Sequence, residues 1–157
     1  MIGRTARAGT EPAETPSLVP LRVRYPETDR MGVVHHSHFF VWFELGRTEL
    51  MRERGCTYKD LEESGIFFPV VEAASRYRRP AHYDEELIVE TTLEEVTAAT
   101  VRFGYRLVRH PAGTLEREEL ARGFTVHACT GPGGRPRRIT GELRGRLLPP
   151  PSPGAGR

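Results

Sequence analysis

The chain has 157 residues, of which 23 are Lys or Arg and 21 are Asp or Glu, so its formal net charge is +2, and 38% of its residues are hydrophobic. This length corresponds to one domain, and no apolar run approaches the roughly 18 residues of a membrane-spanning helix. The evenly mixed charges argue against nucleic acid as the main partner, and the lack of an apolar stretch near the N-terminus predicts a cytoplasmic protein without a secretory signal.

The two ends of the chain differ in composition from the middle. Residues 1–17 show no hydrophobic periodicity, which predicts a disordered leader. Residues 147–157 are rich in Pro and Gly, which predicts an extended tail. We therefore expect one folded domain over residues 18–146. Cys56 and Cys129 lie far apart and form no metal-binding spacing, so we interpret both as small buried thiols.

The first predicted elements are a strand and a long helix. Residues 18–25 alternate between apolar and basic side chains, which is typical of a half-buried strand, and Pro20 favours an edge position. Residues 37–54 are apolar around most of a helical circumference, which predicts a buried helix with a polar sector at Glu44, Arg47 and Thr48. Ser37 is the candidate N-cap.

After the long helix, which Gly55 ends, the pattern changes again. Thr57 opens a short second helix that ends near Gly65. The period then becomes two over residues 67–79, 87–94, 101–107 and 120–128. Short connections between these runs predict antiparallel hairpins. The order of one strand, one buried helix and about four strands predicts an α+β fold with a sheet wrapped around a single helix.

The segment between the first strand and the long helix carries an acid, a glycine and three histidines. A carboxylate at Asp29 could act as general base on a water molecule or attack an acyl carbon itself. Gly32 would let the backbone turn sharply near a ligand. The simpler interpretation is that Asp29 accepts hydrogen bonds within a turn. On position alone, we favour that simpler interpretation.

His36 lies at the start of the long helix, where backbone N–H groups lack intrahelical partners and the helix dipole favours negative charge. A thioester carbonyl directed there would find an oxyanion site. An exposed or capping histidine is the simpler alternative, and we prefer it for His35 and His38. These histidines lack the i, i+4 spacing of helical metal ligands, so we predict no metal site with Asp29 and Glu44.

Two clusters of arginines follow later in the chain. Arg76 and Arg78 share one face of a predicted strand, and either that pair or Arg79 could hold the phosphates of a nucleotide-bearing substrate. A solvated strand end explains these residues equally well. The cluster at residues 135–138 follows a Gly-rich segment that lacks the helix and the Lys-Ser/Thr pair of a phosphate loop, so we interpret it as a surface turn.

Residues 25–36 read Tyr-Pro-Glu-Thr-Asp-Arg-Met-Gly-Val-Val-His-His, and residues 43–49 read Phe-Glu-Leu-Gly-Arg-Thr-Glu. This pattern resembles the 4-hydroxybenzoyl-CoA thioesterase family, and most of all its bacterial short-chain acyl-CoA hydrolase branch. Residues 68–91 share the likeness, which covers roughly residues 20–145. The resemblance implies the hot-dog fold and hydrolysis of acyl-CoA to free acid and CoA without metal or redox cofactor. It also implies a homodimer or tetramer with active sites at the subunit interface.

The resemblance also assigns roles to individual residues. By position, Asp29 matches the essential carboxylate of the family, and His36 matches the helix N-terminal residue whose N–H polarises the thioester carbonyl. Tyr25, Gly32 and Val33 are the accompanying candidates for substrate binding. The departures from the family pattern are Glu27, Met31 and His35, and they leave the acyl group open. Whether Asp29 acts as base or as nucleophile also stays open.

Two other classes of function remain as alternatives. The first is a non-catalytic hot-dog protein that binds acyl-CoA or acyl carrier protein. For an enzyme, the sequence also leaves open whether the acyl group is carried by CoA or by acyl carrier protein. Release of thiol from acyl-CoA would distinguish an enzyme from such a binder. The second is an RNA-binding domain suggested by the arginine clusters, which would require affinity for nucleic acid that falls with salt.

Overall fold

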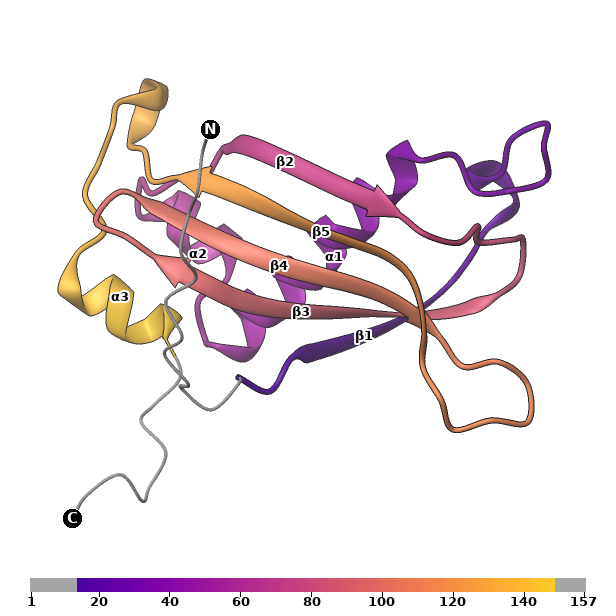
Figure 1. The fold of residues 1–157 in the computed structure, drawn as a ribbon. Coiled ribbons are helices and arrows are strands. Elements are labelled where there is room, and N and C mark those ends of the chain that lie inside the picture. Colours follow the sequence, from indigo (N-terminus) through magenta and orange to yellow (C-terminus); the bar gives the residue numbers. More distant parts are fainter. Residues whose placement is uncertain (1–13, 149–157) are drawn as a thin grey trace, which may run out of the picture.

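The structure is a computed structural model that describes residues 14–148. Five antiparallel strands form one sheet in the order β1-β3-β4-β5-β2, and the long helix α1 crosses one face of it (Figure 1). The elements are β1 (Ser17–Arg22), α1 (Ser37–Glu53), α2 (Tyr58–Glu63), β2 (Val70–Tyr77), β3 (Glu86–Val96), β4 (Thr100–Arg109), β5 (Glu118–Ala128) and α3 (Gly141–Leu147). Short 3-10 turns lie at Tyr25–Glu27 and Pro132–Gly134. The predicted α+β arrangement of a sheet around one helix is confirmed.

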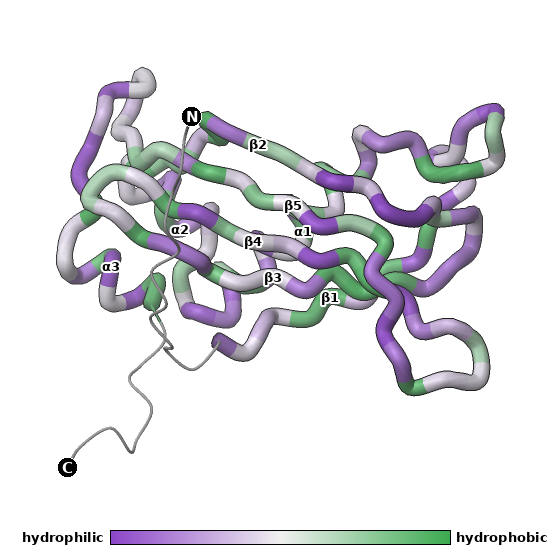
Figure 2. Tube along the Cα trace, viewed as in Figure 1, coloured by the Kyte–Doolittle hydropathy of each residue, from purple (hydrophilic) through white to green (hydrophobic). Residues whose placement is uncertain are grey.

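The core lies between the sheet and α1. Hydrophobic and hydrophilic residues are mixed along β3, β4 and β5 (Figure 2), and the buried hydrophobic residues of these strands belong to the same cluster as those of α1. Phe43 of α1 stacks on Tyr105 of β4 with ring centroids 4.5 Å apart. A Cβ at Gly46 would fall on the Thr91 hydroxyl and lie 2.8 Å from Val89 Cγ1, so α1 packs closely on β3 at this glycine.

The caps of the helices confirm part of the sequence analysis. Gly55 has a φ of +64° and donates its N–H to Arg52, which ends α1 as predicted. Thr57 accepts the N–H of Asp60 at 3.2 Å and caps α2 as predicted. The prediction for Ser37 was wrong, because Ser37 is already helical and its hydroxyl pairs with His35 Nδ1 at 2.8 Å.

Arg47 is also placed differently from the prediction of a polar sector. It is 9% exposed and lies on the buried side of α1, while its guanidinium is 3.6 Å from the exposed carboxylate of Glu44. Burial raises the pKa of the nearby phenols of Tyr58 and Tyr105, and the charge of Arg47 partly opposes that rise. The sequence period could not show this, because burial of Arg47 depends on residues from α2 and β4.

The element limits differ from those predicted at several points. Ser17 belongs to β1 and its hydroxyl donates to Glu53 at 2.9 Å, so it is part of the folded domain. Leu147 is fully buried in α3, a helix that the sequence analysis did not predict. The strand expected over residues 67–79 is shorter, because the N–H groups of Arg78 and Arg79 both point to the carbonyl of Leu120. The predictions for residues 1–13 and 149–157 lie outside the described residues.

Over residues 14–148, every helix is too short or too polar to cross a bilayer.

Candidate active site

Glu27 fixes the loop that leads from β1 to α1. Its carboxylate is buried and accepts hydrogen bonds from the backbone N–H of Arg24 at 2.7 Å and from the indole of Trp42 at 3.2 Å. Burial by itself raises the pKa of this carboxyl, but these bonds and the Arg24 guanidinium outweigh that effect, so the net pKa is lowered. The carbonyl of Glu27 accepts the N–H of His35. The loop is therefore held against α1 at both of its ends.

Asp29 lies in a tight turn within this loop. Its Oδ1 accepts the N–H of Met31 at 2.8 Å, and its backbone carbonyl accepts the N–H of Gly32 at 3.0 Å. Gly32 has a φ of +76°, which a residue without Cβ adopts at little cost. The simpler interpretation of Asp29 as a turn residue is thus observed. It is compatible with a chemical role, because the Met31 bond engages only one of the two carboxylate oxygens.

The turn opens onto a cavity of about 340 Å³ between the loop, the first turn of α1 and the end of β2. Its lining residues are Asp29, Met31, Val33, Val34, His36, Phe39, Tyr77, Arg78, Arg79 and Pro80. A volume of this size lies within the range of small-ligand pockets, about 300–1,000 Å³. The two residues assigned to chemistry from the sequence therefore meet at one site, although seven positions separate them.

His36 occupies the N-cap position of α1 and has an exposed side chain. The N–H groups of His38 and Phe39 donate to the carbonyls of His35 and His36, at 3.1 and 3.3 Å, and Ser37 N–H donates to the ring of His35 at 3.3 Å. None of these bonds uses the N–H of His36. This backbone group, at the positive end of the α1 dipole, is the candidate oxyanion donor.

The other candidate residues divide into two groups. Val33, Arg78 and Arg79 line the cavity together with Asp29 and His36, whereas Tyr25, Gly32 and Arg76 are not among its lining residues. Tyr25 is 75% exposed and packs edge-to-face on Tyr83, and Gly32 shapes the turn. Arg76 pairs in register with Arg122, on the sheet face opposite α1.

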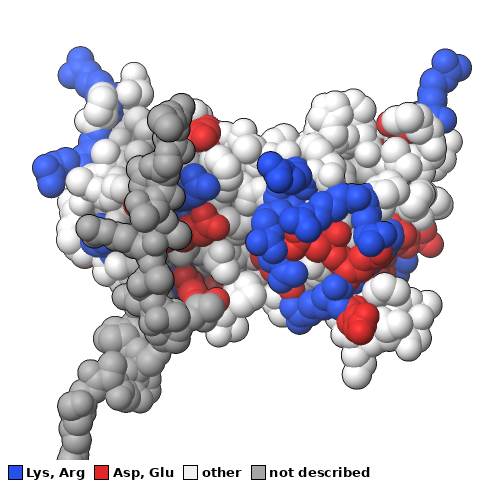
Figure 3. Space-filling model, viewed as in Figure 1, with Lys and Arg blue, Asp and Glu red and all other residues white. Residues whose placement is uncertain are grey.

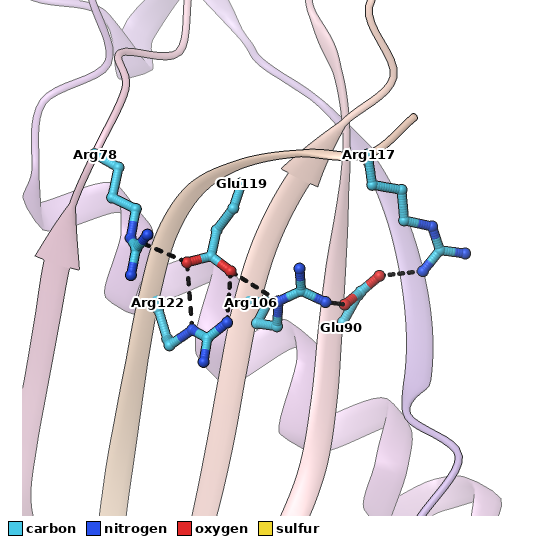
Figure 4. A network of polar contacts seen from close by, with 6 residues as sticks. All are labelled: Arg78, Glu90, Arg106, Arg117, Glu119 and Arg122. Atoms are coloured by element: carbon cyan, nitrogen blue, oxygen red, sulfur yellow. Dashed lines mark hydrogen bonds and ion pairs between the residues drawn. The ribbon is translucent and has the colours of Figure 1, made fainter. Parts of the chain in front are cut away.

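Arg78 and Arg79, which directly follow β2, contact acidic residues near that outer face. Arg78 contacts Glu119 at 3.1 Å and Arg79 contacts Glu118 at 2.9 Å. Figure 3 shows Arg side chains surrounding acidic ones on this face, and Figure 4 shows how Arg78, Arg106 and Arg122 converge on Glu119, while Arg106 and Arg117 hold Glu90. A phosphate at Arg78 or Arg79 would compete with these carboxylates.

Glu119 shows the electrostatic effect of this network. The hydrogen bond from Arg122 lowers its pKa most, burial opposes the change, and Arg106 lowers the pKa further, to about 2. Glu119 therefore stays ionised at any pH at which the protein would work. Within residues 14–148 no group of three or more His, Cys, Asp or Glu side chains is arranged to hold a metal ion.

Tyr77 also lines the cavity, although it was not among the predicted site residues. Tyr77 is the last residue of β2 and lies between Arg76 and Arg78, and alternation along the strand directs it to the opposite face from Arg76. There its ring packs edge-to-face on Phe39 of α1, with centroids 4.8 Å apart. The alternation of the strand indicates that Tyr77 faces the helix, but the prediction for this segment considered only the neighbouring arginines.

Comparisons with known proteins show the family of the chain. Residues 23–153 match the sequence model of a family described as the thioesterase-like superfamily. YneP of Bacillus subtilis (strain 168), named as a candidate acyl-CoA thioesterase, is 41% identical over 109 residues, which are 69% of this chain and 75% of YneP. YbgC of Haemophilus influenzae, named an acyl-CoA thioesterase, is 41% identical over 92 residues, which are 58% of this chain and 68% of YbgC.

A solved structure has the same fold. A hypothetical protein from Thermus thermophilus superimposes with a TM-score of 0.75 at 40% sequence identity, over 83% of this chain and 96% of that protein.

Proposed function

We propose that the chain, which belongs to the thioesterase-like superfamily, is an acyl-CoA thioesterase in which Asp29 and the N-terminal end of α1 act together. The observation that carries the proposal is that Asp29 and His36 line the same cavity. The names of the relatives YneP and YbgC support acyl-CoA as the substrate. The reaction would yield a free acid and CoA.

The geometry supports a division of labour between two groups. The thioester carbonyl would point at the N-terminus of α1, where the His36 N–H and the helix dipole stabilise the negative charge of the tetrahedral intermediate. Asp29 would take a proton from a water molecule whose oxygen adds to the acyl carbon. The C–S bond then breaks, and the departing thiolate receives the proton, so that acid and thiol leave.

Asp29 could instead act as a nucleophile. In that case its carboxylate oxygen adds to the acyl carbon, the thiolate departs, and water hydrolyses the resulting anhydride. Both routes use the same two groups and give the same products. Labelled oxygen from water can enter the carboxylate of Asp29 in a single turnover only on the anhydride route, when water attacks the aspartyl carbonyl, so its detection by mass spectrometry would show that Asp29 is the nucleophile.

The proposal extends to the carrier and the assembly. Arg78 and Arg79, at the mouth of the cavity, would attract the phosphates of CoA, with Arg76 nearby on the outer face. Acyl carrier protein is the alternative carrier. We expect a cytoplasmic homodimer, or a tetramer built from two such dimers, which needs no metal or redox cofactor.

The proposal is tested by thiol release from a panel of acyl-CoA substrates. Asp29→Asn keeps the shape of the side chain but cannot accept a proton, so we expect kcat to fall by about 10² to 10⁴. The matched control is Asp60→Asn on the exposed side of α2, which should keep wild-type turnover. Wild-type turnover in Asp29→Asn would remove Asp29 from the mechanism. Binding without thiol release on every acyl chain would favour the non-catalytic alternative.

A further inference from the structure

The start of α1 leaves one backbone N–H group without a hydrogen-bond acceptor. The N–H of His35 donates to the carbonyl of Glu27 at 2.9 Å, and the two N–H groups that follow Ser37 donate to carbonyls of the same turn. The N–H of Ser37 donates to the Nδ1 atom of the His35 ring at 3.3 Å. Within residues 14–148, the N–H of His36 is therefore the one donor of this turn that no protein group accepts.

We propose that His35 is a positioning residue for the oxyanion site. Its unprotonated Nδ1 accepts the N–H of Ser37 and thereby holds the peptide group that directly follows the donor residue, His36. This role rests on the proposed thioesterase function, because it concerns the His36 N–H as the group that binds the thioester oxygen. From the sequence, His35 was interpreted as an exposed or capping histidine, and the proposal gives the capping ring a part in the reaction.

The donors around the His35 ring determine which nitrogen carries its proton. A backbone N–H can only donate, so the Nδ1 atom that accepts from Ser37 has no proton of its own. The Ser37 hydroxyl lies 2.8 Å from the same nitrogen and therefore donates to it as well. In the neutral ring the proton is then on Nε2. A single ring nitrogen thus accepts two donors at the start of the helix.

His35 takes the place of the usual N-cap side chain. The N-cap position of α1 belongs to His36, which has helical torsions (φ −55°, ψ −28°) and whose side chain makes no capping hydrogen bond to the described residues. Ser, Thr, Asp and Asn commonly supply such a bond from this position. Here the acceptor comes from one residue earlier and reaches two residues ahead, as Asn and Asp side chains do in turns. The His36 side chain can therefore line the cavity instead.

The peptide group between His36 and Ser37 is held at both ends. Its N–H is bound by the His35 ring, and its carbonyl oxygen accepts the hydroxyl of Tyr77 at 3.1 Å. Tyr77 ends β2, which lies beside the start of α1 (Figure 1). The preceding peptide group carries the donor N–H, and its carbonyl accepts the N–H of His38 at 3.1 Å. Both peptide groups that flank the Cα atom of His36 are thus restrained.

Packing supports the position of the His35 ring. Its centroid lies 4.2 Å from that of the His36 ring, with 34° between the ring planes, and the ring of His38 packs edge-to-face at 6.4 Å. These contacts restrict the side-chain torsions of a residue that is otherwise exposed. The acceptor nitrogen is therefore held by ring contacts as well as by its own hydrogen bonds.

The direction of an oxyanion donor matters most in the transition state, when negative charge develops on the thioester oxygen. Loss of the ring acceptor would leave the Ser37 N–H without a partner and would let the peptide group after His36 rotate. The thioester oxygen would then meet a donor whose direction is less well defined. Because this contact strengthens as the reaction proceeds, its loss should lower kcat and leave KM nearly unchanged.

Two variants of His35 separate the acceptor from the ring. His35→Asn keeps an acceptor near the position of Nδ1, whereas His35→Phe keeps the ring packing but has no acceptor. We expect kcat of His35→Phe to fall by about two- to tenfold at constant KM, and that of His35→Asn to stay near the wild-type value. The control is His110→Phe, at an exposed histidine outside the cavity lining. Wild-type kcat in His35→Phe, or equal losses in both variants, would overturn the role of His35.

A double variant tests whether the two ends of the peptide group act together. Tyr77→Phe removes the bond to the carbonyl of His36, and His35→Phe removes the bond to the N–H of Ser37. If both bonds hold one peptide group, the first loss already lets it rotate. The double variant should then lose less kcat than the product of the two single losses. Losses that multiply would overturn the claim that both side chains restrain the same group.

Spectroscopy tests the capping contact without any reaction. In a long-range proton–nitrogen spectrum at pH 8, the ring signals that vanish in His35→Asn belong to His35. We expect these signals to show an unprotonated Nδ1 and a protonated Nε2. The Ser37 amide should exchange with solvent faster in His35→Phe than in the wild type or His35→Asn. A proton on Nδ1, or equal exchange in all three proteins, would overturn the cap.

The two proposals fail in different ways. If the wild type releases no thiol from any acyl-CoA, the thioesterase function fails, but the nitrogen spectrum and the amide exchange still decide whether His35 caps α1. If the wild type releases thiol and His35→Phe turns over at the same rate, the thioesterase function stands and the positioning role of His35 is overturned.

Discussion

The hydroxyl of Tyr77 donates a hydrogen bond to the carbonyl oxygen of His36 at 3.1 Å. This contact joins the last residue of β2 to the residue that precedes α1. The Tyr77 ring also packs edge-to-face on the His36 ring, with centroids 6.3 Å apart. The position of the candidate oxyanion donor therefore depends on the end of the edge strand.

Tyr77→Phe should lower activity without unfolding the protein. The ring contacts stay, but the hydrogen bond is lost, which is worth about 0.5–1.5 kcal/mol. If this energy positions the His36 backbone, kcat falls by about two- to tenfold with little change in KM. Steady-state kinetics measures this, with Tyr83→Phe, an exposed tyrosine outside the cavity lining, as the control. An unchanged kcat would show that the contact does not position the donor.

Glu27→Gln should destabilise the protein most at neutral pH. Because the folded pKa of Glu27 lies below its ordinary value of 4.5, ionised Glu27 contributes stability that is present above about pH 4.5 and is lost as the pH falls through the folded pKa. We expect a cost of about 1–3 kcal/mol at pH 7. In urea unfolding, the difference in unfolding free energy between wild type and variant should become smaller below pH 4.5. A difference that does not change with pH would contradict this.

His127 is the end of a buried chain of hydrogen bonds. Its Nδ1 lies 2.9 Å from the carbonyl of Phe68, which can only accept, so Nδ1 carries the proton. Its Nε2 then accepts from the Thr125 hydroxyl at 2.8 Å, and that hydroxyl accepts from Tyr105 at 2.6 Å. Burial lowers the pKa of His127 to about 4, although the Phe68 carbonyl opposes the change.

The protein should therefore lose stability as the pH falls from 6.5 to about 4. In this window the unfolded chain binds a proton at His127 and the folded chain does not, so stability rises with pH. The full difference is about 3 kcal/mol. His127→Gln cannot titrate, so its unfolding free energy, measured at pH 5 and pH 7, should change less than that of the wild type. Equal pH slopes for the two proteins would refute this assignment.

Two glycine-to-alanine changes in helices should have opposite effects on the stability of the protein. Gly46→Ala places a methyl group on Thr91 and Val89, and overpacking of this kind costs about 1–3 kcal/mol. Gly145→Ala in α3 meets no atom within 4 Å and should stabilise the protein by about 0.5–1 kcal/mol. Thermal unfolding of both variants measures the difference. A stable Gly46→Ala would mean that α1 can move away from β3.

The sequence predicted the elements whose side chains repeat regularly. The period of the apolar residues identified α1 and the four strands that follow it, because each of these elements has one face on the core. Asp29 and His36 were brought together by resemblance to a known family. Their chain positions alone favoured a turn residue and an exposed histidine.

The predictions that were wrong concern contacts made by distant parts of the chain. Arg47 looked like a surface residue because its helical neighbours are polar, but α2 and β4 cover it. Leu147 was assigned to a tail because prolines follow it, but α3 places it in the core. The joining of Tyr77 to the α1 terminus depends on which edge of the sheet β2 occupies. Local patterns carry no information on these points.

Trp42 is the only tryptophan of the chain, and its indole N–H is bound to Glu27 in the loop that contains Asp29. Its ring also touches Phe39, which lines the cavity, with centroids 5.2 Å apart. The tryptophan fluorescence of the protein therefore comes from one residue beside the site. Its emission wavelength offers a label-free signal for titrating ligands and for following their arrival in a stopped-flow instrument.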